Sequence, residues 1–175
     1  MNTTKKLAAC LLLSVAVGLS DLAAQTQQVT VNASIAQLLT LTVDTNTVTL
    51  AFLATDFAVD TGIAVKTALK ASTFSVTSNR AWKLTVQPGN PAFTFTPTGT
   101  SVDPKMPASA LALRTGTGAY VPLPTAGGIT VVQGNSGGSA TTGNVVPVDY
   151  QMTANLAIDP PGAYLLTLTY TLASQ

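Results

Sequence analysis

Apolar residues alternate with small polar residues through most of this chain after its first two dozen positions. The alternation begins with Val29, Val31, Ala33 and Ile35, which threonine, asparagine and serine separate. A period of two places every second side chain on the same face of a β-strand. The pattern therefore predicts strands with one dry face and one wet face.

The same alternation returns in stretches that polar segments and segments with glycine or proline separate. These predicted strands lie at residues 39–43, 48–52, 74–76, 82–86, 93–95, 110–114, 129–133, 148–158 and 164–172. Residues 74–86 are typical of a hairpin, whereas residues 54–69 fit either a short helix or a long loop. The glycine-rich residues 134–143 predict a loop without an apolar anchor. Many short strands without a convincing helix predict an all-β protein, an immunoglobulin-like antiparallel β-sandwich.

The first 24 residues contain the three parts of an export signal in order. Two lysines form a basic start, residues 7–19 are apolar, and small residues precede a predicted cleavage site after Ala24. The apolar part is too short for a transmembrane helix, which needs about 20 apolar residues. We therefore expect residues 1–24 to be a cleaved signal peptide. Residues 25–175 are expected to form a single β-sandwich domain, secreted to the cell surface or cell envelope and without a transmembrane segment.

Residues 7–10 also match a lipobox, in which Cys10 would be lipidated and become the first mature residue. In lipoprotein signals that box follows the apolar region, whereas here most of the apolar residues follow Cys10. We therefore favour cleavage after Ala24. The only cysteine of the chain is then lost with the leader, so the mature protein is expected to have no disulfide.

The composition removes most of the side chains that perform chemistry near neutral pH. The chain has no histidine and no glutamate, and its one cysteine lies in the predicted leader. Ser-His-Asp catalysis, thiol catalysis and histidine-ligated zinc sites are thereby excluded. Outside the leader, six basic and six acidic side chains balance, and no basic stripe indicates a nucleic-acid partner. We therefore predict a non-enzymatic protein without a cofactor.

Six aspartates outside the leader are the remaining candidates for acid–base catalysis or for calcium binding: Asp44, Asp56, Asp60, Asp103, Asp149 and Asp159. No pair of them has a recognisable catalytic spacing, and no D-x-[DN]-x-[DN]-G calcium loop occurs. Most lie beside threonine, asparagine, proline or glycine, so we expect them to stabilise turns. The sequence therefore predicts no catalytic and no metal-binding residue. A carbohydrate-active enzyme with paired aspartates is the lowest alternative.

Trp82 shares a strand face with Leu84 and Val86, which predicts that its ring fills the core. The Trp82-Lys83-Leu84 motif resembles the WxL-type cell-surface domain, as do residues near the C-terminus: Gly162, Tyr164, Tyr170 and Leu172. The resemblance implies a secreted β-sandwich that is held non-covalently on the cell wall, with peptidoglycan as its ligand. Tyr170 stands in this chain where that family has a distal tryptophan.

The C-terminal alternation after residues 161–164 also resembles subunits of chaperone–usher pili, including the spore-coat-U-like group. This second resemblance implies that Val29, Val31, Ala33 and Ile35 form a strand that one copy donates to its neighbour. The chain lacks the cysteine pair and the final aromatic residue that are common in such subunits.

The sequence thus predicts a structural or adhesive protein of the cell surface. Its expected partners are a cell-wall polymer or neighbouring surface proteins. The alternative is a fimbrial subunit that forms a homopolymer by donor-strand exchange through its N-terminal strand.

Overall fold

The computed structural model describes residues 30–175 of the chain. The predicted signal peptide and Val29 lie outside the described residues. The chain divides into two units, Met1–Ile35 and Ala36–Gln175. In the described part of the first unit, residues 30–35 form no helix or strand, and the side chains of Val31 and Ile35 are 83% and 90% exposed.

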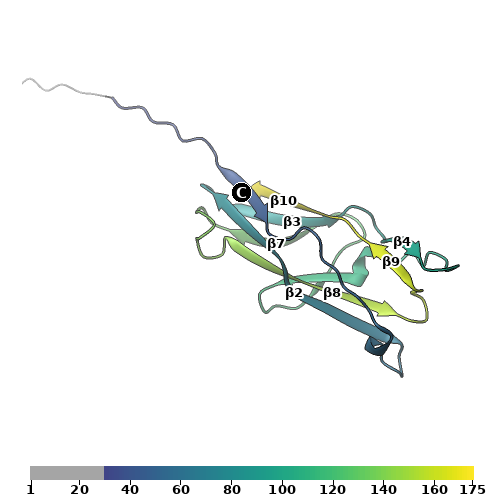
Figure 1. Cartoon of the computed structure of the whole chain (residues 1–175). Helices are drawn as coiled ribbons and strands as arrows, with labels where there is room; N and C mark the ends of the chain where they lie inside the picture. The colour runs from purple at the N-terminus through teal and green to yellow at the C-terminus, as the bar shows by residue number, and fades with distance from the viewer. Residues whose placement is uncertain (1–29) are drawn as a thin grey trace, which may run out of the picture. The chain divides into compact units, whose positions relative to one another are not determined.

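The second unit is built from antiparallel strands in sandwich-like sheets (Figure 1). Five strands form the first sheet in the order β1-β2-β8-β5-β6, with bounds Leu39–Val43, Ile63–Ser78, Val145–Asn155, Leu111–Thr115 and Val121–Pro122. Three strands form the second sheet in the order β10-β3-β7, with bounds Leu168–Ser174, Trp82–Pro88 and Ile129–Gly134. A separate pair joins β4 (Thr94–Pro97) to β9 (Gly162–Leu165), and two short 3₁₀ helices, η1 (Ala54–Asp56) and η2 (Ala108–Ala110), lie between strands. The all-β prediction is confirmed.

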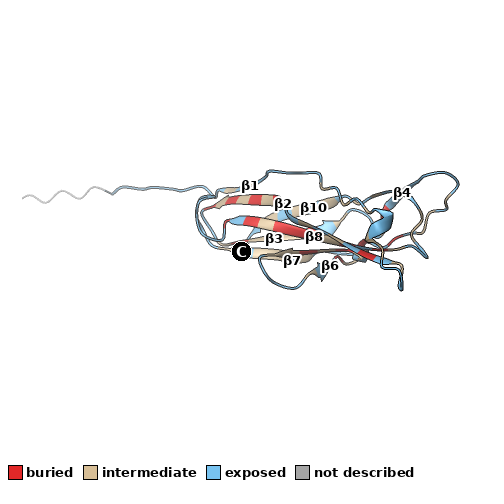
Figure 2. Cartoon of the chain, turned by 60° about the horizontal axis from the view of Figure 1, so that its bottom comes forward, coloured by how far each residue is buried: buried red, intermediate tan, exposed pale blue. Residues whose placement is uncertain are grey.

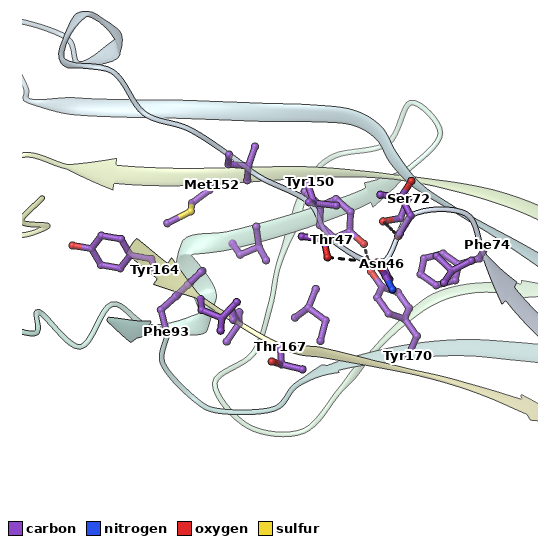
Figure 3. A pocket seen from close by; sticks show the side chains of 18 of the residues that line it. Asn46, Thr47, Ser72, Phe74, Phe93, Tyr150, Met152, Tyr164, Thr167 and Tyr170 are labelled. Atoms are coloured by element: carbon purple, nitrogen blue, oxygen red, sulfur yellow. Dashed lines mark hydrogen bonds between the residues drawn. The ribbon is translucent and has the colours of Figure 1, made fainter. Parts of the chain in front are cut away.

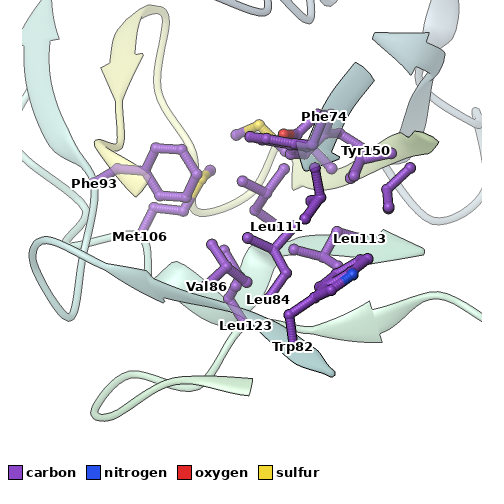
Figure 4. Close-up of a cluster of buried hydrophobic side chains, with 14 residues drawn as sticks. Phe74, Trp82, Leu84, Val86, Phe93, Met106, Leu111, Leu113, Leu123 and Tyr150 are labelled. Atoms are coloured by element: carbon purple, nitrogen blue, oxygen red, sulfur yellow. The ribbon is translucent and has the colours of Figure 1, made fainter. Parts of the chain in front are cut away.

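The core lies where the dry faces of the two larger sheets meet. The inward face of β3 contributes three buried side chains, Trp82, Leu84 and Val86. Figure 4 shows them beside Phe74 and Leu113 of the first sheet. Figure 2 shows the buried residues of the first sheet concentrated in β2 and β8. Because each large apolar side chain contributes about 1.5–3 kcal/mol when buried, this layer is the main source of stability.

The predicted hairpin at residues 74–86 is wrong, because β2 and β3 belong to different sheets. Residues 79–81 carry the chain from the first sheet to the second. Asn79 holds this corner, since its amide donates to the Ala36 carbonyl at 2.8 Å and its side-chain oxygen accepts the Leu38 N–H at 2.9 Å. Alternation cannot distinguish a hairpin within one sheet from a corner between two facing sheets, since each strand has a dry face in both arrangements.

Residues 54–69, for which a short helix and a long loop both remained open, contain one three-residue 3₁₀ helix, η1, and neither alternative accounts for the remainder. β2 already begins at Ile63, and its register with β8 shifts between Ala68 and Ser72. Lys70 lies in this β-bulge with φ of 47°. The first half of the strand is hidden from a periodicity analysis because its larger apolar side chains, Ile63, Val65 and Leu69, are exposed, while Lys66 lies on the more buried side. The predicted last strand is likewise divided, because β9 pairs with β4 whereas β10 pairs with β3.

The glycine-rich loop of residues 134–143 packs over Trp82, so the prediction of a loop without an apolar anchor is wrong. The indole Nε1–H donates to the Asn135 carbonyl at 3.0 Å and to Asn144 Oδ1 at 3.3 Å. Gly134 faces Trp82 in the β3–β7 ladder, and a Cβ at that position would lie 2.2 Å from a ring carbon. The indole ring therefore occupies the space that any side chain at position 134 would need.

We expect Gly134→Ala to lower the free energy of unfolding by about 1–3 kcal/mol, the usual cost of overpacking a filled core. Urea unfolding followed by the fluorescence of Trp82 measures this difference. Gly138→Ala is the matched control, because no atom lies within 4 Å of a Cβ built there. Equal stabilities for the two variants would contradict the close packing of Trp82 on Gly134.

Asp149 of β8 stabilises the bulge of β2. Its carboxylate accepts the Lys70 N–H at 2.6 Å and the Arg114 Nε–H at 2.9 Å. The Lys70 N–H, and then Arg114, hold the pKa of Asp149 below its ordinary value of about 3.9. A carboxyl whose pKa is lower in the folded state stabilises the protein above its unfolded pKa, and that contribution is lost as the pH falls through the folded pKa.

We therefore expect stability to decline below about pH 4, partly through protonation of Asp149. Asp149→Asn should lower stability at pH 7 and should make the acid part of the stability curve shallower. Denaturant unfolding at a series of pH values between neutral and acid measures both effects. Asp60→Asn is the control, because Asp60 is exposed and forms no ion pair with the described residues. An acid slope that both variants share with the parent would count against Asp149.

Candidate functional site

A cavity of about 530 Å³, lined by both apolar and hydroxyl side chains, lies at the side of the sandwich where an edge of each larger sheet meets the other (Figure 3). We call it the lateral cavity. One wall is formed by residues of the stretch 41–50, and the opposite wall by residues 164–168 and Tyr170. Core side chains complete the lining: Ser72, Phe74, Phe93, Leu111, Tyr150 and Met152. None of the lining residues is charged.

The first wall begins with the end of β1 and continues, after Asp44 and Thr45, as residues 46–52, which have no partner strand. Val48, Leu50 and Phe52 are partly buried and the residues between them are exposed, so the alternation predicted at 48–52 is present. However, no backbone group of residues 46–52 forms a backbone–backbone hydrogen bond within the part of the chain that the structure describes. The segment therefore has the side-chain pattern of a strand without its ladder.

The second wall contains β10, which is an edge strand. It pairs with β3 along its whole length, and its other side has no strand neighbour among residues 30–175. An edge strand presents a row of unpaired N–H and C=O groups. The sequence of β10, LTYTLAS, contains no charge, proline or glycine that would discourage a further strand from pairing there.

The inward-facing side chains of both walls are incompletely covered. Leu168, Tyr170 and Leu172 of β10 are only partly buried, whereas Trp82 and Leu84 of the neighbouring strand β3 are fully buried. The same partial burial holds for the inward side chains of residues 46–52. The lateral cavity is therefore a gap in the core layer, with apolar surface on two sides.

Two tyrosine hydroxyls bridge the two sheets beside the cavity. The hydroxyls of Tyr150, from β8, and Tyr170, from β10, lie 2.8 Å apart, and the Tyr170 ring packs on Phe74 with 4.2 Å between ring centroids. Burial, with Tyr150 as a further cause, raises the pKa of Tyr170 far above its ordinary value. The Tyr170 hydroxyl therefore stays protonated and gives the cavity a polar but uncharged point.

The residues that carry the WxL resemblance have structural positions in this protein. Trp82 and Leu84 lie in the core, and Leu172 faces Leu84 across the β10–β3 ladder. Gly162 allows the close approach of Phe95, whose ring a Cβ would meet at 2.3 Å. The Tyr164 hydroxyl donates to the Pro160 carbonyl, and burial, followed by nearby aspartates, raises its pKa to about 12. The Trp-x-Leu motif therefore contributes to the core and not to an exposed aromatic surface.

Five of the six candidate aspartates have local structural partners. These pairs are Asp44 with the Thr73 N–H, Asp56 with Lys66, Asp103 with Lys105, Asp149 with Arg114 and Asp159 with the Asn155 N–H. Among residues 30–175, no group of three or more His, Cys, Asp or Glu side chains is placed to hold a metal ion. In that same part of the chain, no helix has the length and apolar character needed to cross a membrane.

Comparison with known proteins gives no assignment for this chain. No protein-family model matches it, and no curated protein matches it either.

The donor residues and the cavity walls differ in how far the sequence identifies them. Val31, Ala33 and Ile35 follow directly from alternation, and the two larger side chains are exposed. The walls were missed as a site, although the alternation of residues 48–52 and 164–172 is plain in the sequence. These segments form a site because they have no neighbouring strand to pair with. That depends on the sheet topology, which the alternation of apolar and polar residues does not report.

We expect Tyr150→Phe and Tyr170→Phe each to cost about 1–3 kcal/mol, because each change leaves the other hydroxyl without its partner. The double variant should cost less than the sum of the two single changes, since no orphan hydroxyl remains. Unfolding free energies of the four proteins form a double-mutant cycle. Additive losses would show that the two hydroxyls do not interact.

Proposed function

We propose that this protein is a non-enzymatic structural subunit of a cell-surface polymer. Copies join when residues 25–35 of one copy add as a strand in the lateral cavity of another. The observation that carries the proposal is the pair of unpaired backbone edges, residues 46–52 and β10, on opposite walls of one uncharged cavity. A strand placed between them would form main-chain hydrogen bonds with both edges and would bury its alternate side chains.

The chemistry of the incoming segment suits this cavity. Val29, Val31, Ala33 and Ile35 share one face, and residues 25–35 carry no charge. Eleven extended residues span about 36 Å, whereas the seven residues of β10 span about 23 Å. The segment is therefore long enough to pair along all of β10.

Three other sheet edges of the second unit carry features that discourage pairing. β7 pairs with β3 through a register shift, and β6 has two residues, of which one is Pro122. The free edge in the first half of β2 contains Lys66, which pairs with Asp56, and ends at the bulge of Lys70. β10 has none of these features, and β1, the remaining edge strand of the first sheet, borders the same cavity, which favours this side of the unit as the place that accepts a strand.

A place outside the cell is supported by the export signal predicted at residues 1–24. Attachment to a cell-wall polymer rests on the WxL resemblance alone, and Trp82 and Leu84 are core residues in this fold. Polymer formation therefore has the stronger physical argument.

We expect Val31→Asp/Ile35→Asp to convert polymers of the full-length exported protein into monomers. Burial of each aliphatic side chain contributes about 1.5–3 kcal/mol, so loss of both should weaken association by roughly a hundredfold or more. Size-exclusion chromatography and negative-stain microscopy measure the result. A labelled peptide of residues 25–35 should still bind this variant, because its cavity is intact.

Thr30→Asp/Ser34→Asp is the matched control, since these residues lie on the opposite face of the predicted donor strand. This variant should polymerise as the parent does. A monomeric parent, or equal losses for the two double variants, would refute strand addition through the apolar face.

A further inference from the structure

Exposed aliphatic side chains gather at one end of the second unit, where β2 begins and β8 ends (Figure 1). Five residues form this cluster, which we call the aliphatic end: Leu53, Val59, Ile63, Leu156 and Ile158. Val59 is fully exposed and Ile158 is 66% exposed. The cluster is therefore an apolar surface without a cover among the described residues, and such surfaces mark interaction sites.

The segments that carry these side chains are fixed on the first residues of β2. Three contacts hold them there: the Ala58 N–H donates to the Ile63 carbonyl, the Leu156 N–H donates to the Gly62 carbonyl, and Asp56 of η1 forms an ion pair of 2.8 Å with Lys66. The aliphatic end is thus built by the fold before any partner arrives.

The backbone of the aliphatic end satisfies its own hydrogen bonds. Four of its five aliphatic residues donate their N–H to a group of the same end: Leu53 to the Asp56 carboxylate, Ile63 to the Thr61 hydroxyl, Leu156 to the Gly62 carbonyl and Ile158 to the Asn155 carbonyl. A surface of this kind can leave water without leaving those donors unpaired.

The same bonds close the aliphatic end to an added strand. The first residue of β2, Ile63, has its N–H on Thr61 and its carbonyl on Ala58, so no further strand can pair with it there. β10, in contrast, presents an open row of backbone groups. A partner at the aliphatic end therefore meets apolar side chains and few free backbone groups. A lipid surface fits this arrangement, because lipid offers its acyl region no hydrogen-bond partner and every backbone group has to be satisfied within the protein.

The charges of the aliphatic end indicate the kind of lipid. Residues 53–63 and 155–159 contain three aspartates and no basic residue. Asp56 is neutralised by Lys66, whereas Asp60 and Asp159 form no ion pair with the described residues. Anionic lipids attract lysine and arginine, so this end would be repelled by them. Zwitterionic headgroups, which carry no net charge, suit it better.

We propose that the aliphatic end rests on a zwitterionic phospholipid surface, with Val59, Leu156 and Ile158 at the boundary between headgroups and acyl chains. Asp60 follows Val59 in the same turn, so the contact is shallow and the carboxylate stays among the headgroups. None of the five aliphatic residues lines the lateral cavity. Lipid contact and strand addition therefore use different surfaces of one copy, and each can fail without the other.

The test is flotation of the full-length exported protein with vesicles of phosphatidylcholine and phosphatidylethanolamine. We expect Val59→Asp/Ile158→Asp to bind the vesicles roughly tenfold or more weakly than the parent, because two aliphatic side chains lose their burial. Val121→Asp/Val145→Asp is the matched control, since it changes two half-exposed valines outside the aliphatic end and adds the same charge. A parent that does not bind the vesicles, or equal losses in the two double variants, would overturn the proposal.

Lipid composition tests the charge argument. Replacement of part of the phosphatidylcholine by phosphatidylserine should weaken binding of the parent, and Asp60→Lys should reverse this preference. Binding of the parent that requires phosphatidylserine would refute a zwitterionic surface.

A second series separates lipid contact from polymer formation and from the apolar residues 25–35. It repeats the comparison in a Val31→Asp/Ile35→Asp background, in which strand addition is disabled. Val59→Asp/Ile158→Asp should cause the same loss of vesicle binding there, and an unchanged affinity would place the lipid contact elsewhere. If the aliphatic end instead joins two copies, the variant reduces the size of the protein in solution and the parent ignores vesicles, which also refutes the proposal.

Discussion

Each side of a β-strand presents a row of N–H and C=O groups, and every row requires a partner strand, a side chain or water. In the second unit, β3 has strand neighbours on both sides and its inward side chains are fully buried. β10 and residues 46–52 lack a neighbour on one side, and their inward side chains are only partly buried. The missing backbone partner and the gap in the core are therefore one feature: the strand that would complete the ladder would also supply the absent apolar layer.

Period-two alternation predicted the class of fold and most strands, because it reports directly which residues need a dry face. It failed where polarity does not follow burial, as in the first half of β2, where Ile63 and Val65 are exposed and Lys66 lies on the more buried side. It also failed to assign partners. β2 and β3 follow each other with matching alternation, yet lie in opposite sheets, because a dry face is needed both beside a strand and across the core from it. Pairing is a property of the whole chain, and single segments do not encode it.

The donor segment could be predicted from the sequence and the acceptor cavity could not, again because strand pairing depends on the whole chain. A donor segment carries its own evidence, since Val31 and Ile35 are apolar, alternate and exposed. An acceptor is defined by what is missing beside it, and that depends on where β1, β9 and β10 are placed by residues far along the chain. The position of a single side chain was easier to predict where core packing determines it. Trp82 was expected in the core on parity alone, and it is buried against Gly134 and Asn144.

The few charged side chains help to determine which sheet edge can accept a further strand. A charged side chain that points inward, or a bulge, makes an exposed strand a poor template for another chain. Here Lys66 and the Lys70 bulge lie on the free edge of β2, while β10 and the lining of the lateral cavity carry no charge. Obstruction of these edges therefore directs a further strand to the lateral cavity, which β10 and β1 border, in addition to apolar attraction at β10. Because neither the cavity nor residues 25–35 carry a charge, strand addition itself should depend weakly on salt.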